Sequence, residues 1–131
     1  MFPFGPPDPP DQPGPARHIA YVLATDSKPK VPRLLLAYTS SGPWRGVSAR
    51  LPLGVMEFDD AAARAVGQKP FHIDLRCLAQ VPLAKRWFPD LGLTDFGIIG
   101  TASARLRERI DVMLSDLVAR NRDLIEMRGP R

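Results

Sequence analysis

The stretch HIAYVLATDSKPKVPRLLLAYTS, residues 18–40, contains two apolar runs on either side of a polar turn. The first run, residues 18–25, is rich in β-branched and aromatic side chains, and the second, residues 33–39, is short and sharply bounded. Both patterns are typical of β-strands. Residues 26–30 carry Asp, Ser and Pro, which favour a turn. Pro32 stands at the start of the second strand, where its missing N–H is tolerated. The simplest topology is therefore an antiparallel hairpin.

Shorter elements follow this hairpin. Residues 51–58 predict a third strand, which a proline and a glycine interrupt. Asp59 stands where a helix N-cap belongs, before a helix of about two turns over residues 60–66, and Gly67 supplies its stop.

Further along the chain, residues 71–75 alternate apolar and polar side chains, as a half-buried strand does. Residues 78–81 either continue that strand or begin the next one. Residues 85–100 are mostly irregular by composition.

The last element is a long amphipathic helix. Ser103 can cap its start, and most of the arginines in this segment lie off the apolar stripe. A helix of about 22 residues would be ~33 Å long, which suits packing across a small barrel or forming part of a dimer. The stripe has i, i+3/i+4 spacing and consists of Leu106, Ile110, Met113, Leu114, Leu117, Val118 and Ile125.

Together, the predicted elements are about five or six strands, one short helix and one long C-terminal helix. This combination predicts an α+β domain built on a small, strongly bent β-sheet. Seven of the 15 prolines fall within residues 1–15, which predicts an extended proline-rich tail over residues 1–16 and a single domain over residues 17–131.

Composition narrows the class of protein. The chain has 131 residues, 44% of them hydrophobic and 24% charged, as expected for one soluble domain. No apolar run approaches the roughly 18 residues that cross a bilayer, and the start of the chain lacks a signal-peptide pattern. One cysteine, Cys77, excludes an internal disulfide framework and a Cys-based metal cluster. A reduced, cytoplasmic setting without membrane association is the expectation.

The net charge is positive. Eighteen Lys and Arg residues against 14 Asp and Glu residues give +4. A modestly basic protein suits polyanionic partners, because each phosphate that it neutralises releases counterions. The alternative is an arginine-rich composition without any single basic patch.

Most motifs for catalysis and cofactor binding are absent. The chain has no phosphate-binding glycine loop, no HExxH and no GxSxG, and its two histidines, His18 and His72, lack partners at metal-ligand spacing. The pair Asp59-Asp60 is better explained by helix capping than by metal binding. A buried apolar role is expected for Cys77. No cofactor and no metal are therefore expected.

One constellation of polar residues remains. In an antiparallel hairpin, the start of one strand and the end of the next lie at the same end of the sheet, near solvent. That geometry would bring together Arg17, His18, Thr39, Ser40 and Arg45. A histidine, a guanidinium and a hydroxyl are the groups that metal-independent cleavage of RNA through its 2′-OH requires. The alternative is a surface turn whose polar groups are satisfied locally.

The same order of motifs resembles the PemK/MazF toxins. The resemblance rests on Gly14-Pro-Ala-Arg17-His18, on a strand ending in Thr39-Ser40, on Ile73-Asp74-Leu75-Arg76, and on Gly97-Ile-Ile-Gly100 before a terminal helix. It implies an SH3-like barrel and a homodimer. It also implies metal-independent endoribonuclease activity on single-stranded RNA, and neutralisation by a cognate antitoxin.

The resemblance assigns roles to individual residues. Arg17 falls at the catalytic arginine of that family and Thr39 at its catalytic threonine or serine. His18 is a candidate acid or base, and Ser40 and Arg45 are candidate RNA contacts. The proline-rich start departs from the usual first strand of the family. Two other readings stay open: a non-catalytic barrel that binds nucleic acid or protein, and a structural dimer module.

Overall fold

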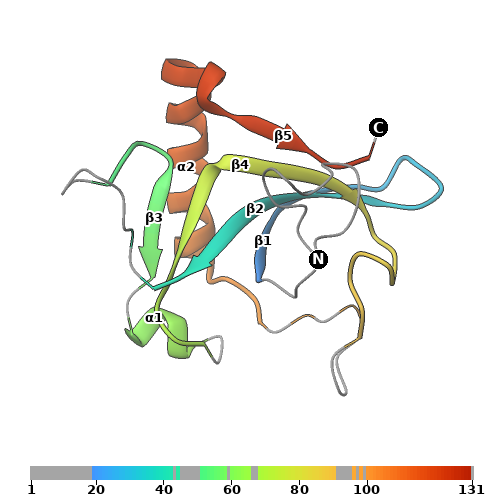
Figure 1. Ribbon diagram of the computed structural model, residues 1–131, viewed down its shortest axis with the longest axis horizontal. Helices are drawn as coiled ribbons and strands as arrows, with labels where there is room; N and C mark the ends of the chain where they lie inside the picture. The colour runs from blue at the N-terminus through green and yellow to red at the C-terminus, as the bar shows by residue number, and fades with distance from the viewer. Residues whose placement is uncertain are drawn as a thin grey trace.

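Five strands form one curled sheet in the part of the chain that the structure describes (Figure 1). The structure is a computed structural model, and it describes residues 19–42, 44, 51–58, 60–65, 68–90, 96, 98 and 100–130. Four strands are antiparallel in the order β1-β2-β4-β3, and β5 pairs with β4 in parallel. The strands are β1 (Ala20–Asp26), β2 (Arg33–Ser41), β3 (Val55–Phe58), β4 (Phe71–Pro82) and β5 (Glu126–Arg128).

The predicted hairpin is confirmed. Strands β1 and β2 pair antiparallel from Ala20 opposite Tyr38 to Asp26 opposite Arg33, with a bulge between Val22 and Ala24. The turn between the two strands is stabilised at its first residue, because the carboxylate of Asp26 accepts a hydrogen bond from the backbone N–H of Lys28 at 3.0 Å.

Strand β4 is the centre of the sheet. It pairs with β2 on one edge, and on the other edge it pairs first with β3 and then with β5. All five residues from Phe71 to Leu75 are buried, so the prediction of a half-buried strand there was wrong. The reason is that both faces of the strand are covered. The continuation of this strand through residues 78–81 is confirmed.

The two faces of the sheet carry separate apolar clusters. One face, here called the helix face, packs against α2 (Ala104–Asn121), which lies behind the sheet in Figure 1. Its buried residues include Ile73, Leu75, Ile110 and Leu117. The opposite face, here called the outer face, holds a second cluster of Leu34, Leu36, Ala79, Val81 and Trp87. Trp87 comes from the irregular segment after β4 and is 3% exposed, so this segment covers one end of the outer face.

The C-terminal helix begins as predicted and ends earlier. The Ser103 hydroxyl accepts a hydrogen bond from the backbone N–H of Leu106 at 3.2 Å, which confirms the cap. The helix stops at Asn121, and a 3-10 turn, η2 (Arg122–Leu124), leads into β5, which the sequence did not predict. Ile110 and Leu117 are fully buried, but Val118 is 41% exposed, so its place in the predicted stripe was wrong.

Two glycines have backbone conformations that the fold requires. Gly129 has φ +113°, and a Cβ there would lie 2.0 Å from the carbonyl oxygen of Gln80, so only glycine lets the chain pass this close to β4. Gly54 has φ +97° in the turn before β3, where a Cβ would meet Leu117 at 3.0 Å. This turn shortens the third strand, which was expected from residue 51.

The remaining expectations concern the short helix and the chain's N-terminal tail. The short helix, α1 (Asp60–Arg64), is present. Its predicted capping residues Asp59 and Gly67, and the predicted tail of residues 1–16, lie outside the described residues. The expected α+β class is confirmed as a curled half-barrel sheet with a C-terminal helix. None of the described helices is long and apolar enough to cross a membrane.

Candidate functional site

The predicted site residues fall into two groups. Arg17, His18 and Arg45 lie outside the described residues. Thr39 and Ser40 lie at the end of β2, and the start of β1 is beside them, because the Thr39 hydroxyl donates a hydrogen bond to the carbonyl oxygen of Ile19 at 2.6 Å. The expectation that the start of the first strand and the end of the second meet at one end of the sheet is therefore confirmed.

Thr39 and Ser40 point to opposite sides of the sheet. Thr39 pairs with Ile73 on the helix face and is 2% exposed, so its expected position near solvent was wrong. Ser40 is opposite His72 on the outer face and is half-buried. Successive side chains of a strand alternate between faces, so the sheet does not bring these two side chains together.

A cluster of polar and aromatic side chains occupies the outer face next to Ser40. His72 lies opposite Ser40 of β2 on one side and opposite Glu57 of β3 on the other. The side chains of this group, here called the β4 cluster, are Trp44, Glu57, His72, Asp74 and Arg76.

His72 is oriented by the backbone. Its Nδ1 lies 3.0 Å from the carbonyl oxygen of Gly42, which can only accept, so Nδ1 carries the hydrogen in this contact. In the neutral ring, Nε2 then holds the lone pair and is the basic nitrogen. The ring meets the indole of Trp44 edge-on, with centroids 5.7 Å apart and an interplanar angle of 86°. The imidazole is thus fixed in both orientation and tautomer.

Arg76 is fixed by Asp74. The guanidinium donates from Nε at 2.9 Å and from one terminal nitrogen at 2.7 Å to the two carboxylate oxygens, and the backbone N–H of Arg76 adds a third bond at 3.0 Å. The hydrogen bond to Asp74 raises the pKa of Arg76 above its usual value, although burial opposes this. The guanidinium also lies 5.1 Å from the ring centroid of Trp44. A bidentate pair of this kind fixes the guanidinium in one place and offsets much of its charge, while the guanidinium N–H groups that do not face Asp74 stay available as donors.

Trp44 links the parts of the cluster. Its backbone N–H donates to Glu57 Oε1 at 3.3 Å, while its ring contacts both His72 and Arg76. Its indole Nε1 is buried and makes no hydrogen bond to any described residue. The cluster therefore combines a basic nitrogen, two carboxylates, a guanidinium paired with one of them, and an aromatic ring.

The sequence analysis missed this cluster, although part of its signal is visible. His72, Asp74 and Arg76 occupy every second position of β4, but the alternation over residues 71–75 was interpreted only as a half-buried strand. The register with β3 and the position of Trp44 have no local signal. Of the described residues, no three His, Cys, Asp or Glu side chains gather where they could hold a metal ion.

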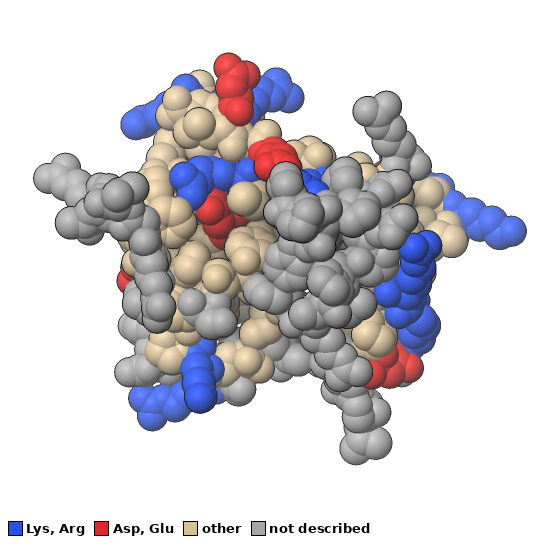
Figure 2. Space-filling view, in the orientation of Figure 1, with Lys and Arg blue, Asp and Glu red and all other residues tan. Residues whose placement is uncertain are grey.

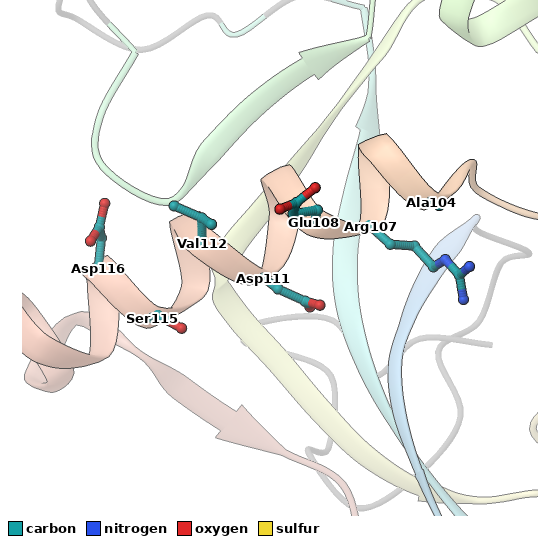
Figure 3. A pocket seen from close by; sticks show the side chains of 7 residues that line it. All are labelled: Ala104, Arg107, Glu108, Asp111, Val112, Ser115 and Asp116. Atoms are coloured by element: carbon teal, nitrogen blue, oxygen red, sulfur yellow. The ribbon is translucent and has the colours of Figure 1, made fainter.

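An open hollow of about 470 Å³ lies along α2, on the opposite side of the sheet from the β4 cluster. Figure 3 shows its lining side chains along one side of the helix, with Arg107 reaching toward β1. Burial raises the pKa of Tyr21 in β1, and the charge of Asp111 raises it further. Three acids, Glu108, Asp111 and Asp116, outnumber Arg107 in the lining, so the hollow is unsuited to a polyanion.

Cys77 follows the β4 cluster on the same strand and is half-buried. Burial raises the pKa of its thiol, and the charges of Asp74 and Glu126 raise it further. A raised pKa disfavours the thiolate and therefore a nucleophilic role, although Cys77 is half-buried and not buried as expected.

We compared the chain with known proteins in three ways. Searches against protein-family models, curated proteins and solved structures returned no match to the chain.

Proposed function

We propose that this protein is a metal-independent endoribonuclease that cleaves single-stranded RNA at the β4 cluster. The observation that carries the proposal is the juxtaposition of a tautomer-fixed His72 with Glu57 across the strand pair and with the fixed cation of Arg76. The positive net charge of the chain, +4, supports a polyanionic substrate.

These groups fit the chemistry of cleavage through the 2′-OH. His72 is 7% exposed, so the proposal requires the substrate to reach the edge of its ring, where Nε2 takes the 2′-proton while the 2′-oxygen attacks phosphorus and the bond from phosphorus to the 5′-oxygen breaks. Arg76 stabilises the negative charge that develops on the phosphoryl oxygens. The imidazolium that forms then returns the proton to the 5′-oxygen. The products are a 2′,3′-cyclic phosphate and a free 5′-hydroxyl.

The proposal extends to the broader role that the resemblance to PemK/MazF toxins implies. On that basis the curled sheet belongs to an SH3-like barrel, and the protein is a homodimeric toxin of a toxin–antitoxin pair. Arg17 and His18, which immediately precede Ile19 in the chain, and Arg45 would add charge stabilisation, acid–base capacity and RNA contacts. Thr39 holds the start of β1 through its hydroxyl.

The experiment is cleavage of a labelled single-stranded RNA by the purified protein. His72→Gln and Arg76→Gln should each lower the rate at least ~100-fold, the scale of removing a preorganised catalytic group. EDTA should leave the rate unchanged, and a 2′-deoxy sugar at the cut position should abolish cleavage. Arg105→Gln is the matched control, because it removes one exposed positive charge from α2, and it should keep the wild-type rate. A wild-type rate for His72→Gln, with the variant folded, would contradict the proposal.

A second candidate function is RNA binding without cleavage. It is favoured by the contact between Arg76 and Trp44, because a guanidinium and an indole also form a platform on which bases stack. In that case the wild-type protein shifts RNA in a gel and leaves it intact. A protein that neither cuts nor binds RNA at low salt would leave the structural-module alternative.

A further inference from the structure

Three exposed basic side chains lie toward the end of the molecule farthest along β2 from the β4 cluster. The backbone N–H of Leu83 donates to the carbonyl oxygen of Pro32 at 2.7 Å, which brings the segment after β4 against the β1–β2 turn. This contact places Lys28 and Lys30 of the turn at the same end as Arg86, and all three side chains are exposed. Figure 2 shows blue side chains gathered along this right-hand end, where the turn lies in Figure 1. These three residues are called the basic end.

Two acids lie near the basic end, and one of them is paired with a lysine outside it. Asp90 pairs with Lys85, whose ammonium also lies 4.0 Å from the ring centroid of Phe96. The carboxylate of Asp26 accepts from the backbone N–H of Lys28. Within the described part of the chain, no ion pair is recorded for Lys28, Lys30 or Arg86. Three exposed basic side chains therefore stand against the single charge of Asp26 in this turn, and this local excess of positive charge attracts phosphate groups.

The basic end and the β4 cluster are joined by one strand. From Arg33 to Ser40, strand β2 has seven residue steps, which span about 23 Å at ~3.3 Å per residue. A single strand of RNA held at the β4 cluster and extended in the direction of β2 would pass over the segment that covers Leu34 and Leu36, and would bring later phosphates to the basic end. Single-strand sites on small barrels cover roughly 4–16 nucleotides, so this span is an ordinary one.

We infer that the basic end is a second phosphate-contact surface for single-stranded RNA, so that the substrate is an RNA long enough to reach both ends of β2. This inference rests on the proposed function, because the β4 cluster provides the first contact. Lysine and arginine contacts to phosphates raise affinity without selecting a sequence. The basic end therefore raises the affinity for longer RNAs, whereas the β4 cluster carries out the cleavage.

The test compares binding of two 2′-O-methyl RNAs, which resist cleavage, by fluorescence anisotropy. One RNA has about five nucleotides and the other about fifteen, at the two ends of the range of single-strand site sizes. The wild-type protein should bind the longer RNA at least ~10-fold more tightly. The triple variant Lys28→Gln, Lys30→Gln, Arg86→Gln should lose this gain and bind the short RNA as the wild type does. For the long RNA, the slope of the logarithm of the binding constant against the logarithm of salt concentration should become smaller in magnitude by about two. Three phosphate contacts are lost, and each contact to a single strand contributes roughly 0.7.

The matched control is Arg105→Gln, Arg109→Gln, Arg120→Gln, which removes the same charge from the exposed side of α2 and should keep the length-dependent gain. An equal loss in both triple variants would show a general charge effect and overturn the inference. The inference is also overturned if the basic-end variant binds long RNA as tightly as the wild type does. This holds even if the same variant loses binding to vesicles of anionic lipid, because the basic end would then be a lipid contact and not an RNA contact. Cleavage of short RNA is expected to survive in the basic-end variant, so failure of the basic end is distinguishable from failure of the β4 cluster. A wild-type protein that binds neither RNA would overturn both.

Discussion

Individual polar side chains hold the sheet's ends in place, and Thr39 is the clearest example. Its hydroxyl reaches the backbone carbonyl of Ile19 at 2.6 Å, in a position that is 2% exposed. A partly buried carbonyl that loses its donor carries part of the desolvation cost of an unpaired group. Thr39 therefore couples the end of β2 to the start of β1, independently of any contact with RNA.

Thr39→Val should lower the free energy of unfolding by about 1–3 kcal/mol, because it leaves the Ile19 carbonyl without this donor. Thr39→Ser keeps the hydroxyl and should cost less. Urea denaturation of the two variants measures the difference. Equal stabilities for valine and wild type, together with a loss of RNA cleavage, would show instead that the hydroxyl acts on the substrate.

A second prediction at the scale of single residues concerns Cys77. Burial raises the pKa of its thiol, so the folded protein should react with iodoacetamide at pH 8 more slowly than the urea-unfolded chain does. The raised pKa also means that the unfolded chain loses its thiol proton first as pH rises. The stability contribution of this group is therefore complete below the unfolded pKa, about 8.5, and is lost as pH rises through the folded pKa. Alkylation of the folded protein at the unfolded rate would contradict this.

Among the elements, α2 shows how one residue step changes the role of a side chain. Leu117 is fully buried and packs against the helix face, whereas Val118, the next residue, is 41% exposed. Adjacent helix positions differ by about 100° around the axis, so the apolar stripe includes one and not the other.

Leu117→Ala should lower the free energy of unfolding by about 2–5 kcal/mol, since it opens a cavity in a closed core. Val118→Ala should cost less than about 0.5 kcal/mol, as a substitution on a solvated side does. Thermal or chemical denaturation of the two variants gives the comparison. Similar costs at both positions would mean that a second surface covers Val118 in solution.

At the scale of the whole molecule, the candidate site, the exposed basic residues and the acidic hollow lie in different places. The outer face carries the β4 cluster, the end of the hairpin carries exposed basic residues, and the hollow along α2 is acidic. By net charge, a polyanion is therefore attracted to the hairpin turn and repelled from the hollow along α2, whereas the β4 cluster has no excess of positive charge, because Glu57 and Asp74 stand against Arg76.

Deletion of residues 2–13 tests whether the domain needs its proline-rich start. The segment offers few backbone donors to any sheet, so the truncated protein should keep its melting temperature within a few degrees. Differential scanning calorimetry of the two forms measures this. A fall above about 8 °C, worth about 1–2 kcal/mol in a domain of this size, would show that the segment docks on the domain.

The sequence by itself determined the elements whose signals are local. The hairpin follows from two apolar runs around a turn, and the start of α2 follows from the Ser103 cap and the spacing of the residues after it. These features could be predicted because the residues responsible lie within a few positions of one another. The α+β class follows from the same local signals.

Only the tertiary structure decided the full extent of β4, the presence of β5 and the composition of the candidate site. Strand β5 has three residues and no periodicity, and it exists because Gly129 lets the chain run close beside Gln80. Glu57 and His72 become neighbours through the register of β3 with β4, and Trp44 joins them from a loop. A one-residue change of register would turn these side chains to the other face, and the sequence around each of them carries no record of that choice.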